Sequence, residues 1–597
     1  MKAVLLAAGS GSRIKPFSLT KSKVMLSFLG KPLLFYHIDE FLENGIDEVI
    51  IVCNSDNVAE IKKEASSAYP HVRFAFCVQD EQLGPSHAIY CAKDFIAGDE
   101  FFLFKYADSV SGEALVRALL DCFHSAECDG AVTLRQVDEP SRYGIARIEN
   151  GRVVEIVEKP GKDAPSDLAL VGVGILRSVD FIKGVEMDEL FVGKKEVAPP
   201  EYVLRQNGHL NYWVYNGKRE DLGKPWDVLL VNRLLISRFD CSVSGSVHSS
   251  AQVGKDCFVS GNAVVGANSE VRNCSSVEGV VGRNCVIDNS MIMKGTVIGD
   301  DCHIINSVIG ENNSFGNGFV TRTSADDALV FVKDHYEKPP IARLGLFTGS
   351  NVIVDAGLFS EQCKIVYPDR TVKKNIVKDC LIRAVVFDAD NTLYNTKDVA
   401  EQADMVVMKF MAMQTNKTPE ELYHYWKSKI VDKLKNENDP KKRHRLFSYN
   451  LLAKEFRVAD SGAFRLFLER LLYLLRPLQG VEDVLNSLKR FKLAVVSEDS
   501  SDMLLAKLMK LGLRSYFDVV VSSDKIGVMK PNGAYLAEAL RLLNVVPQEC
   551  LVVGDDYEKD IALWKQKGAV VVCFNCSGNS DFSIKDYSEF GTILEDI

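Results

Sequence analysis

The stretch KAVLLAAGSGSR, residues 2–13, decides how the start of this chain folds. Residues 2–6 are a short apolar run with the pattern of a buried strand, and the segment after them contains Gly9 and Gly11. Glycines in a tight strand-to-helix turn let backbone N–H groups converge on an anion without interference from a Cβ atom. A helix that follows such a loop directs its positive end at the same place. The pattern therefore predicts a phosphate-binding loop at the start of an α/β domain.

Two cations accompany this loop, since Arg13 ends it and Lys23 follows in the next segment. They supply the positive charge that a bound triphosphate needs. The loop alone is equally consistent with an ordinary turn, because glycine is the default residue of tight turns. It also matches neither of the two best-known glycine-rich phosphate motifs. The rest of the chain has to decide between these interpretations.

Length and composition limit the classes of protein to be considered. At 597 residues the chain is too long for one hydrophobic core, and about three to four domains are expected. Its net charge is -10 and it contains no long run of Lys or Arg, which argues against a nucleic-acid-binding surface. No apolar stretch approaches the length of a membrane span, and the N-terminus lacks the pattern of a signal peptide. We expect a cytoplasmic protein without nucleic-acid or membrane partners.

Sequence texture divides the chain into three predicted domains. Residues 1–235 alternate strand-like runs with helical patterns, which is typical of a mostly parallel, Rossmann-like sheet with helices on both faces. Residues 240–373 carry a repeat with a period of six. Residues 381–597 return to the α/β alternation, and long helical patterns over about 397–480 predict an α-helical cap on a second Rossmann-like core.

The middle domain repeats an aliphatic or aromatic residue at every sixth position. The members of a first block are Val247, Val253, Val259, Val265, Val271 and Val277, and those of a second block are Phe347, Ile353, Phe359 and Ile365. Six residues form one flat side of a β-helix coil, with the apolar side chain pointing inward. The stretch 321–343 interrupts the repeat and is predicted to be a protruding loop. Packing of such coils on one another would make the protein a homo-oligomer.

Polar residues with a common chemistry follow the predicted strands of the C-terminal domain. They are Asp388, Asp390, Ser497, Lys530, Asp555 and Asp560. Because the carboxyl ends of parallel strands meet at one edge of a sheet, we expect these groups to share one crevice. The set favours hydrolysis of a phosphate ester through an aspartyl phosphate.

Each catalytic group has a distinct role in this hypothesis. Asp388 attacks phosphorus as the nucleophile. Asp390 protonates the leaving oxygen and then activates water. Ser497 and Lys530 hold the phosphoryl oxygens and offset the developing charge.

The same acids are candidate ligands of Mg²⁺, a hard ion that prefers oxygen ligands. Asp388, Asp555 and the backbone carbonyl of Asp390 are the expected ligands. Asp560 is expected to orient the metal shell or Lys530.

This set resembles the motifs of the haloacid dehalogenase superfamily. The matches, in the order of that family, are Asp388-x-Asp390-x-Thr392, Ser497, Lys530 and the segment from Asp555 to Asp560. The resemblance implies that Thr392 belongs to the substrate-binding residues and that the cap favours small phosphate monoesters. Asp390 implies a phosphatase or mutase, and we favour a phosphatase because residues 397–412 lack the histidine of the family's sugar-phosphate mutases.

The N-terminal domain resembles the sugar-1-phosphate nucleotidylyltransferases in motifs that occur in the same order. The matching residues are Ala8, Gly9, Gly11, Arg13, Lys23, Gln79, Gly84, Asp108, Glu158, Lys159 and Asp221. The resemblance implies that Ala8, Gly9 and Gly11 hold the phosphates of an NTP. It further implies that Gln79 and Gly84 read the nucleobase.

The remaining matches imply a nucleotidyl transfer that depends on positioning and charge neutralisation. Arg13 would stabilise the β- and γ-phosphates as they leave, and Lys23 the α-phosphate. The Glu158-Lys159 pair would contact the sugar and its phosphate. Asp108 and Asp221 would bind Mg²⁺.

The chain departs from that family's pattern at Ser22, Pro85 and Gly172. Gly172 stands where an asparagine usually contacts the sugar. The acceptor is therefore an unusual sugar or another phosphorylated compound. A cytidylyltransferase for a non-sugar phosphate, of the phospho-amino alcohol type and fused to a phosphatase, stays open as an alternative.

The order of transferase and repeat domain resembles microbial bifunctional sugar nucleotidylyltransferase/acetyltransferases, which implies a left-handed β-helix. His303 and His335 are the nearest candidates for an acetyl-transfer base, but neither stands in a clear catalytic pattern. We interpret the β-helix as an oligomerisation and spacing module.

These observations together predict a bifunctional enzyme of nucleotide-sugar biosynthesis. The N-terminal domain would transfer a nucleotidyl group from NTP to a sugar 1-phosphate, giving NDP-sugar and pyrophosphate. The C-terminal domain would hydrolyse a phosphate monoester of the same pathway, such as a sugar bisphosphate. A non-catalytic regulatory scaffold is the rival from another class, and the charged residues of both sites argue against it.

Overall fold

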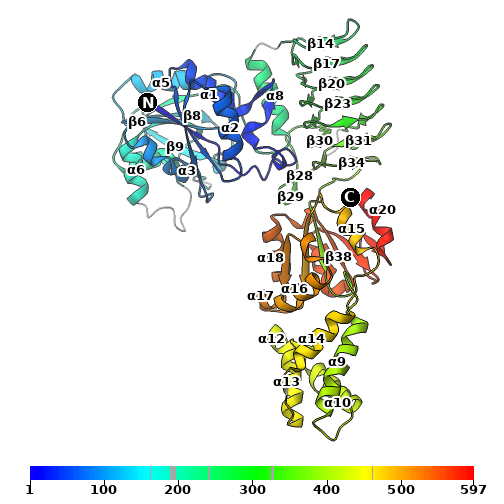
Figure 1. Cartoon of the computed structure of the whole chain (residues 1–597). Helices are drawn as coiled ribbons and strands as arrows, with labels where there is room; N and C mark the ends of the chain where they lie inside the picture. The colour runs from blue at the N-terminus through cyan, green and yellow to red at the C-terminus, as the bar shows by residue number, and fades with distance from the viewer. Residues whose placement is uncertain (162, 188–196, 240–241, 325–327, 460–461, 597) are drawn as a thin grey trace. The chain divides into compact units, whose positions relative to one another are not determined.

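The computed structural model describes the chain except residues 162, 188–196, 240–241, 325–327, 460–461 and 597. The chain forms two compact units, Met1–Asp379 and Cys380–Ile597 (Figure 1). The domain boundary predicted at residue 240, and residues 325–327 of the predicted loop, lie outside the described residues. The other domain boundaries stay predictions.

A nine-stranded sheet forms the centre of the N-terminal part. Its strands, in spatial order, are β5 (Arg73–Val78), β4 (Glu48–Cys53), β1 (Lys2–Leu6), β6 (Phe101–Tyr106), β11 (Leu168–Arg177), β8 (Gly130–Gln136), β12 (Leu210–Val214), β10 (Arg152–Glu158) and β9 (Gly144–Glu149). The first four run parallel, whereas β11 is antiparallel to both β6 and β8. The α/β fold is confirmed, but the sheet is mixed rather than mostly parallel, because β11 reverses direction and β9 and β10 pair antiparallel.

Helices cover both faces of this sheet, as the alternation of side chains along β1 requires. Leu5 of β1 belongs to one core, with α1 (Leu33–Glu43), α2 (Val58–Ala68) and α5 (Val116–His124). Val4 belongs to the opposite core, with α3 (Pro85–Cys91), α6 (Ser178–Met187) and α7 (Pro199–Arg205). The centre of β1 is therefore buried on both faces, and its carboxyl end remains available for a site.

The segment after the glycine loop is not the helix that the sequence predicted. Two 3₁₀ turns follow it, Phe17–Leu19 and Lys23–Met25, and the first α-helix begins only at Leu33. Pro16 explains the difference, because proline lacks an N–H donor and disfavours helical backbone in the residue before it. Arg13 and Lys23 therefore remain the predicted sources of positive charge at the loop.

The repeat region forms a three-sided parallel β-helix. One side consists of β14 (Ser246–Val247), β17 (Val264–Val265), β20 (Val280–Val281), β23 (Val297–Ile298), β26 (Ser314–Phe315), β31 (Ile353–Val354) and β34 (Thr371–Val372). The second side consists of β15 (Gln252–Val253), β18 (Glu270–Arg272), β21 (Val286–Asp288), β24 (His303–Ile305), β27 (Val320–Thr321) and β32 (Phe359–Ser360). The third side consists of β16 (Phe258–Val259), β19 (Ser276–Val277), β22 (Met291–Ile292), β25 (Val308–Ile309), β30 (Leu346–Thr348) and β33 (Lys364–Val366). The six-residue period therefore has the predicted cause, and the left hand of the coil stays a prediction.

The inward register of the second block differs from the prediction at two positions. Ile353 is 49% exposed, whereas its neighbour Val354 is buried. Val354 pairs with Phe315 of the coil before, whose side chain points inward, so the stacking of coils selects Val354. Ser360 is likewise buried in place of Phe359.

A hairpin of β28 (Val330–Val332) and β29 (His335–Glu337) occupies part of the stretch that was predicted as a loop. It reaches the transferase part of the unit, because Lys224 forms an ion pair with Glu337. A second contact joins the segment that carries Lys23 to the coil: Lys21 Nζ lies 2.6 Å from Glu311 Oε1. The β-helix thus supports two segments of the transferase part.

The second unit has a six-stranded parallel sheet. Its strands, in spatial order, are β37 (Val519–Ser522), β36 (Lys492–Ser497), β35 (Ala384–Asp388), β38 (Cys550–Gly554), β39 (Val570–Phe574) and β40 (Phe582–Ile584). One face packs against α15 (Val481–Ser487), α16 (Ser501–Lys510) and α20 (Phe590–Asp596), and the other against α18 (Gly533–Leu543) and α19 (Ala562–Gln566). The all-parallel order places the ends of β35, β36 and β38 side by side.

Between β35 and β36 the chain forms the predicted helical insert. Its helices are α9 (Lys397–Ala412), α10 (Pro419–Tyr425), α11 (Asp432–Leu434), α12 (Pro440–Arg443), α13 (Arg445–Phe456) and α14 (Ala463–Leu474). Figure 1 shows these helices together at one end of the core, with α12 nearest to α17 (Ser523–Ile526). The insert therefore lies at the end of the sheet where the predicted catalytic residues stand.

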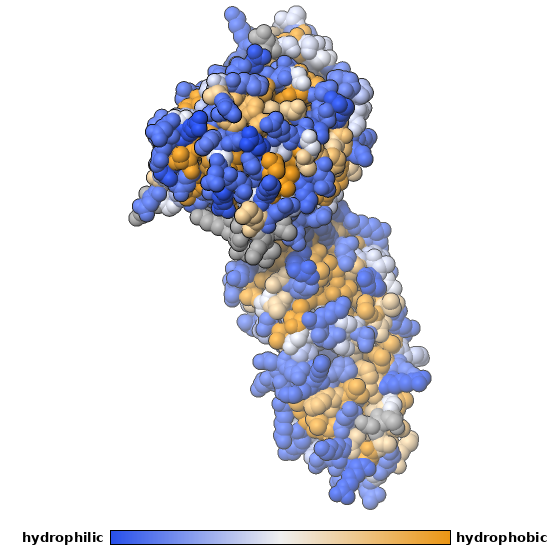
Figure 2. Space-filling model, turned by 90° about the vertical axis from the view of Figure 1, so that its left-hand side faces the viewer, coloured by the Kyte–Doolittle hydropathy of each residue, from blue (hydrophilic) through white to orange (hydrophobic). Residues whose placement is uncertain are grey.

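The surface carries mixed polarity. Figure 2 shows one face, on which hydrophilic residues predominate and hydrophobic residues form separate areas. Among the described residues, no helix combines the length and the hydropathy needed to cross a membrane.

A buried histidine on α1 makes a testable contribution to stability. His37 is 3% exposed, and its Nε2 donates a hydrogen bond to the carbonyl of Ala107 at 3.1 Å. Burial, reinforced by the nearby Lys105, lowers the pKa of His37 to about 3. In the unfolded chain His37 binds a proton as the pH falls below 6.5, whereas in the folded chain it stays neutral. Protonation therefore favours the unfolded chain, and the free energy of unfolding falls as the pH falls below 6.5.

We predict that this group alone makes the first unit about 2 kcal/mol less stable at pH 5 than at pH 7. Urea unfolding followed by the fluorescence of Trp213 and Trp226, with Trp426 and Trp564 replaced by Phe, measures the change. His37→Gln keeps a donor for Ala107 and should remove most of this pH dependence. An equal loss in both chains would contradict the assignment.

Candidate active sites

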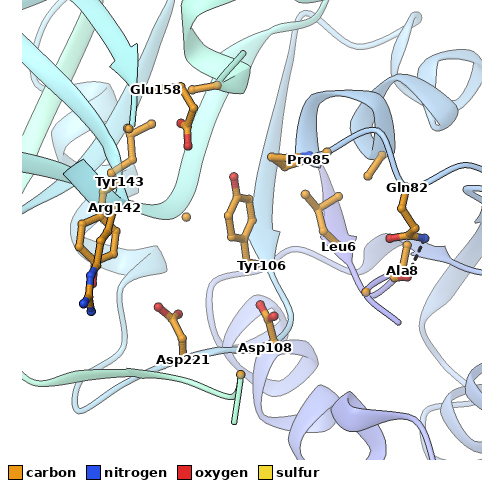
Figure 3. Close-up of a pocket in the computed structure, with 18 of the residues that line it drawn as sticks. Leu6, Ala8, Gln82, Pro85, Tyr106, Asp108, Arg142, Tyr143, Glu158 and Asp221 are labelled. Carbon is orange, nitrogen blue, oxygen red and sulfur yellow. Dashed lines mark hydrogen bonds between the residues drawn. The ribbon is translucent and has the colours of Figure 1, made fainter. Parts of the chain in front are cut away.

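A cavity of about 860 Å³ opens at the carboxyl ends of β1 and β6 (Figure 3). The predicted residues that line it are Ala8, Gly9, Arg13, Gln79, Gly84, Asp108, Glu158, Lys159, Gly172 and Asp221. Gly11 and Lys23, which were also predicted, do not line it. Segments far apart in sequence therefore converge on one space, as a site for two substrates requires.

Gly9 and Gly11 are needed in the loop for different structural reasons. A Cβ atom on Gly9 would lie 3.0 Å from Lys23 Nζ, so glycine lets the lysine lie against the loop. Gly11 adopts a φ of +66° and its carbonyl accepts a hydrogen bond from Ser18 Oγ at 2.7 Å. Gly11 therefore shapes the loop from behind rather than lining the cavity.

Lys23 forms an ion pair with Asp108, which lines the cavity. Partial burial of Asp108, whose side chain is 32% exposed, opposes its charged form, but Lys23 and Arg219 outweigh that effect and hold its pKa below the ordinary value. The predicted phosphate-binding lysine and the predicted metal ligand are thus each other's partners.

Asp221 reaches the same place through a short antiparallel pair. β13 (Arg219–Asp221) pairs with β7 (Ser109–Ser111), so that Asp221 stands opposite Ser109. The backbone N–H of Leu222 donates to the carbonyl of Asp108 at 2.8 Å. Both residues line the cavity, and Figure 3 shows both side chains in its lower part. Two carboxylates in this arrangement have the chemistry of a divalent cation site.

The base-reading candidates are tied to each other. Gln79 is 3% exposed, and its Nε2 donates to the carbonyl of Gly84 at 3.0 Å. Gln82 Nε2 donates to the carbonyl of Ala8 at 3.1 Å, which links this segment to the glycine loop (Figure 3).

The opposite end of the cavity is built around Glu158 and Lys159. Lys159 has a φ of +46°, and its backbone N–H donates to the carbonyl of Tyr143 at 2.9 Å. Gly144 makes room for Glu158, because a Cβ atom there would lie 2.7 Å from Glu158 Oε2.

Gly172 faces an aromatic ring that the sequence reasoning did not assign. It has a φ of +85°, and a Cβ atom there would lie 2.8 Å from Tyr106 Cδ2. Figure 3 shows the Tyr106 side chain in the middle of the cavity, between Glu158 and Pro85. The ring therefore occupies the space that a side chain at position 172 would need.

Further lining residues were missed by sequence reasoning: Arg142, Tyr143, Arg219, Lys224 and Asp227. Asp227 follows Asp221 by six positions, and the sequence reasoning gave it no role. It accepts hydrogen bonds from the N–H groups of Gly223 (3.0 Å) and Lys224 (2.7 Å), and burial raises its pKa to about 7. The two acids and the proline of residues 221–227 were visible in the sequence, but the fold that brings this segment to the cavity was not.

The second candidate site lies at the carboxyl end of β35. Lys530 Nζ donates to Asp388 Oδ1 (2.7 Å), to Asp560 Oδ1 (2.8 Å) and to the carbonyl of Val496 (2.9 Å). These contacts join the ends of β35 and β36 to the helical turn after β38 through one buried ammonium group.

Three carboxylates near that lysine form a candidate metal centre. One oxygen from each of Asp388, Asp555 and Asp560 lies within 4.8 Å of the others. Thr392 Oγ lies 3.3 Å from Asp388 and 3.4 Å from Asp555. Burial raises the pKa of Asp388 despite Lys530, and a divalent cation would offset that effect. The residues therefore fit a hard cation such as Mg²⁺.

Asp390 belongs to a separate network with a lysine that the sequence reasoning missed. Asp390 Oδ1 accepts from Lys507 Nζ at 2.7 Å and from Thr396 Oγ at 2.5 Å. Lys507 is 1% exposed and also donates to Asp499 at 2.6 Å. Ser497 Oγ lies 3.5 Å from Asp390 Oδ2. Lys507 is 117 positions from Asp390 in a helix whose pattern resembles any amphipathic helix, so no local signal identified it.

The histidines considered for acetyl transfer have exposed side chains. His303 lies on β24, and His335 Nδ1 lies 2.8 Å from Asp334 Oδ1 in the hairpin. Neither histidine lines the transferase cavity or the cavity between the helical insert and the core of the second unit.

Three family models match this chain. Residues 2–234 match the model of Nucleotidyl transferase, residues 243–382 that of the GMPPB C-terminal domain, and residues 385–573 that of Haloacid dehalogenase-like hydrolase. The matches are consecutive and cover both candidate sites.

Several curated proteins are similar to part of the chain. The low-salt glycan biosynthesis nucleotidyltransferase Agl11 of Haloferax volcanii is 28% identical over 55% of this chain and 96% of its own length. A bifunctional protein GlmU of Methanococcus vannielii is 26% identical over 59% of this chain and 88% of its own. A glucose-1-phosphate thymidylyltransferase of Streptomyces antibioticus is 29% identical over 51% and 85%.

We predict that Gly172→Ala destabilises the first unit by about 1–3 kcal/mol, because the methyl group meets the Tyr106 ring at a left-handed φ. Tyr106→Ala removes the ring, so the double variant should lose less than the sum of the single losses, by about 1 kcal/mol. A double-mutant cycle on urea unfolding measures this coupling. Strict additivity would contradict the contact.

We predict that Lys507→Met destabilises the second unit by about 3–5 kcal/mol, because it leaves the carboxylates of Asp390 and Asp499 without their buried cation. Adding Asp499→Asn removes one of those charges and should restore part of the loss. Hydrogen exchange of β35 and β36 peptides, measured by mass spectrometry, reports the local stability. Unchanged protection in Lys507→Met would contradict the network.

Proposed function

We propose that this chain, in which a sugar nucleotidyltransferase domain is joined to a haloacid dehalogenase-like hydrolase domain, catalyses two successive steps of nucleotide-sugar biosynthesis. The first domain transfers a nucleotidyl group from NTP to a sugar 1-phosphate and releases pyrophosphate. The second hydrolyses a phosphate monoester. The observation that carries the proposal is the convergence of Arg13, Asp108, Lys159 and Asp221 on one cavity.

The transferase reaction needs little covalent chemistry from the protein. An oxygen of the acceptor phosphate attacks the α-phosphorus, and the bond from that phosphorus to the β-phosphate oxygen breaks. Arg13 binds the β- and γ-phosphates as they leave, while Lys23 turns toward the α-phosphate. Lys159 holds the acceptor phosphate at the far end of the cavity, so that the attack is in line.

Both families generally use divalent metal ions, typically Mg²⁺. In the first domain Asp108 and Asp221 would hold the ion, and in the second Asp388, Asp555 and the backbone carbonyl of Asp390 would hold it. When bound, the ion neutralises phosphate charge. Asp560 keeps Lys530 in place beside the ligands.

The hydrolase reaction proceeds in two steps on this chain's own groups. Asp388 attacks the phosphorus while Asp390 gives a proton to the oxygen that leaves. Water, deprotonated by Asp390, then cleaves the aspartyl phosphate and releases orthophosphate. Lys530, with Ser497 and Thr392, orients the phosphoryl group at Asp388.

A cytidylyltransferase that accepts a non-sugar phosphate is the second candidate for the first domain. The contact of Tyr106 with Gly172 favours it, because an aromatic ring takes the place where an amide would contact a sugar. A regulatory scaffold is less well supported, because a scaffold has no need of ion pairs at strand ends such as Lys23–Asp108 and Lys530–Asp388.

The wider setting of the protein is part of the same proposal. We assign the chain to the cytoplasm because both reactions draw on nucleotides and sugar phosphates made there. We also propose that the β-helix joins copies of the chain into a homo-oligomer.

Pyrophosphate release, measured for each NTP with a panel of sugar 1-phosphates and phospho-amino alcohols, tests the first activity. We expect one nucleotide and one acceptor class to dominate, and Arg13→Ala to lower kcat/KM by about a hundred-fold or more. Lys15→Ala, on the same loop, is the matched control. No pyrophosphate with any pair would refute the transferase.

Metal removal tests the shared requirement. Chelation should abolish both pyrophosphate and orthophosphate release, and Mg²⁺ should restore both. Asp221→Asn should impair only the first activity and Asp555→Asn only the second. Full activity in excess chelator would contradict the two carboxylate sites.

A further inference from the structure

A second cavity, of about 310 Å³, lies in the C-terminal unit between the helical insert and the core. The insert contributes Trp426, Lys435, Arg443, His444 and Arg445, and the core contributes Asp390, Glu498, Asp499 and Ser500. Its size suits a small molecule. Asp388 does not line it, and instead borders a separate space with Lys530.

The position of this cavity identifies which part of a substrate enters it. The proposed proton donor, Asp390, lines the cavity, whereas the proposed nucleophile, Asp388, borders the separate space. A phosphoryl group bound between Asp388 and Asp390 therefore directs its leaving group into this space.

Most charges around the cavity already have partners. Asp390 and Asp499 share Lys507, at 2.7 and 2.6 Å. Arg445 donates to both oxygens of Asp404, at 2.7 and 2.8 Å. These groups are therefore not available to recognise a ligand.

Arg443 is different. Among the described residues its guanidinium donates no hydrogen bond, and the nearest carboxylate oxygen, of Glu498, is 3.6 Å away. Glu498 itself accepts from the backbone N–H of Lys530 at 3.1 Å. Arg443 is a quarter exposed at the end of α12, so its planar set of donors lies at the cavity with its hydrogen bonds unmade. A phosphate or carboxylate matches that fork.

The other wall of the cavity is apolar. Trp426 is 3% exposed and stacks on Tyr449 with ring centroids 5.5 Å apart. Met503 and Met529 complete this wall from the core. A ligand here has a compact body against the aromatic wall and an anionic group at Arg443.

We infer that the hydrolase acts on a small phosphate monoester whose leaving group carries a second anionic group, a phosphate or a carboxylate, bound by Arg443. This inference rests on the proposed phosphatase function. The ester P–O bond breaks, water supplies the oxygen of orthophosphate, and the second anion leaves unchanged. If that anion is a phosphate, the product is a monophosphate of the class that the transferase domain consumes.

The test measures orthophosphate release by the full chain with Mg²⁺ from three probes. Glucose 1,6-bisphosphate carries a second phosphate, 3-phosphoglycerate carries a carboxylate, and p-nitrophenyl phosphate carries neither. We expect one of the first two to exceed p-nitrophenyl phosphate in kcat/KM. Arg443→Gln should lower the ratio of these kcat/KM values about ten-fold or more. Arg443→Lys should lower it less, because the charge remains.

Lys442→Gln is the matched control, since Lys442 is a neighbouring cation of α12 whose ammonium pairs with Glu437 at 3.2 Å. It should leave the ratio unchanged. An equal loss for all probes in Arg443→Gln, or an unchanged ratio, would overturn the inference while the phosphatase stands. No hydrolysis of any probe by the unmodified chain would instead refute the phosphatase, and this inference with it.

Discussion

An aspartate paired with a buried lysine at the end of a central strand is the interaction on which both sites depend. Asp108 follows β6 and pairs with Lys23, and Asp388 ends β35 and pairs with Lys530 at 2.7 Å. The side chains of Lys530 and Asp388 are 6% and 10% exposed, and removing one partner of such a buried pair costs about 3–5 kcal/mol, whereas Lys23 and Asp108 are 12% and 32% exposed. Each pair also holds in readiness the two charges that phosphate chemistry needs, a cation for the phosphate and an anion for a metal ion. The two sheets differ in strand order, yet each has a lysine–aspartate ion pair at the end of a central strand.

The β-helix helps to position the Lys23–Asp108 pair, although none of its described residues lines the cavity of the first site. Lys21 is bound to Glu311, and Glu278 accepts from Ser27 Oγ and the N–H of Gly30, so the segment around Lys23 is fixed at both ends. The inserted hairpin adds the ion pair of Glu337 with Lys224, which lines the cavity. A coil that repeats one simple unit therefore also sets the position of residues in a neighbouring active site.

Features that depend on neighbouring residues could be predicted from the sequence, whereas features that depend on contacts between distant residues could not. The six-residue period and the acids after strands predicted the β-helix and the cluster around Asp388, because each signal is contained in a few neighbouring residues. Pro16 replaced the expected helix with 3₁₀ turns, and stacking on Phe315 shifted the inward register to Val354. Tyr106 and Lys507 could not be assigned, because their partners are distant in sequence and become neighbours only in the folded sheets.

The most direct test of the paired-charge account removes each lysine in turn. ³¹P NMR of the full chain with Mg²⁺, an NTP, a sugar 1-phosphate and a sugar bisphosphate reports pyrophosphate and orthophosphate in one spectrum. Lys23→Met should abolish only pyrophosphate formation, and Lys530→Met only orthophosphate formation. Retention of the corresponding product at more than half the original rate, or loss of both products in either variant, would contradict the account.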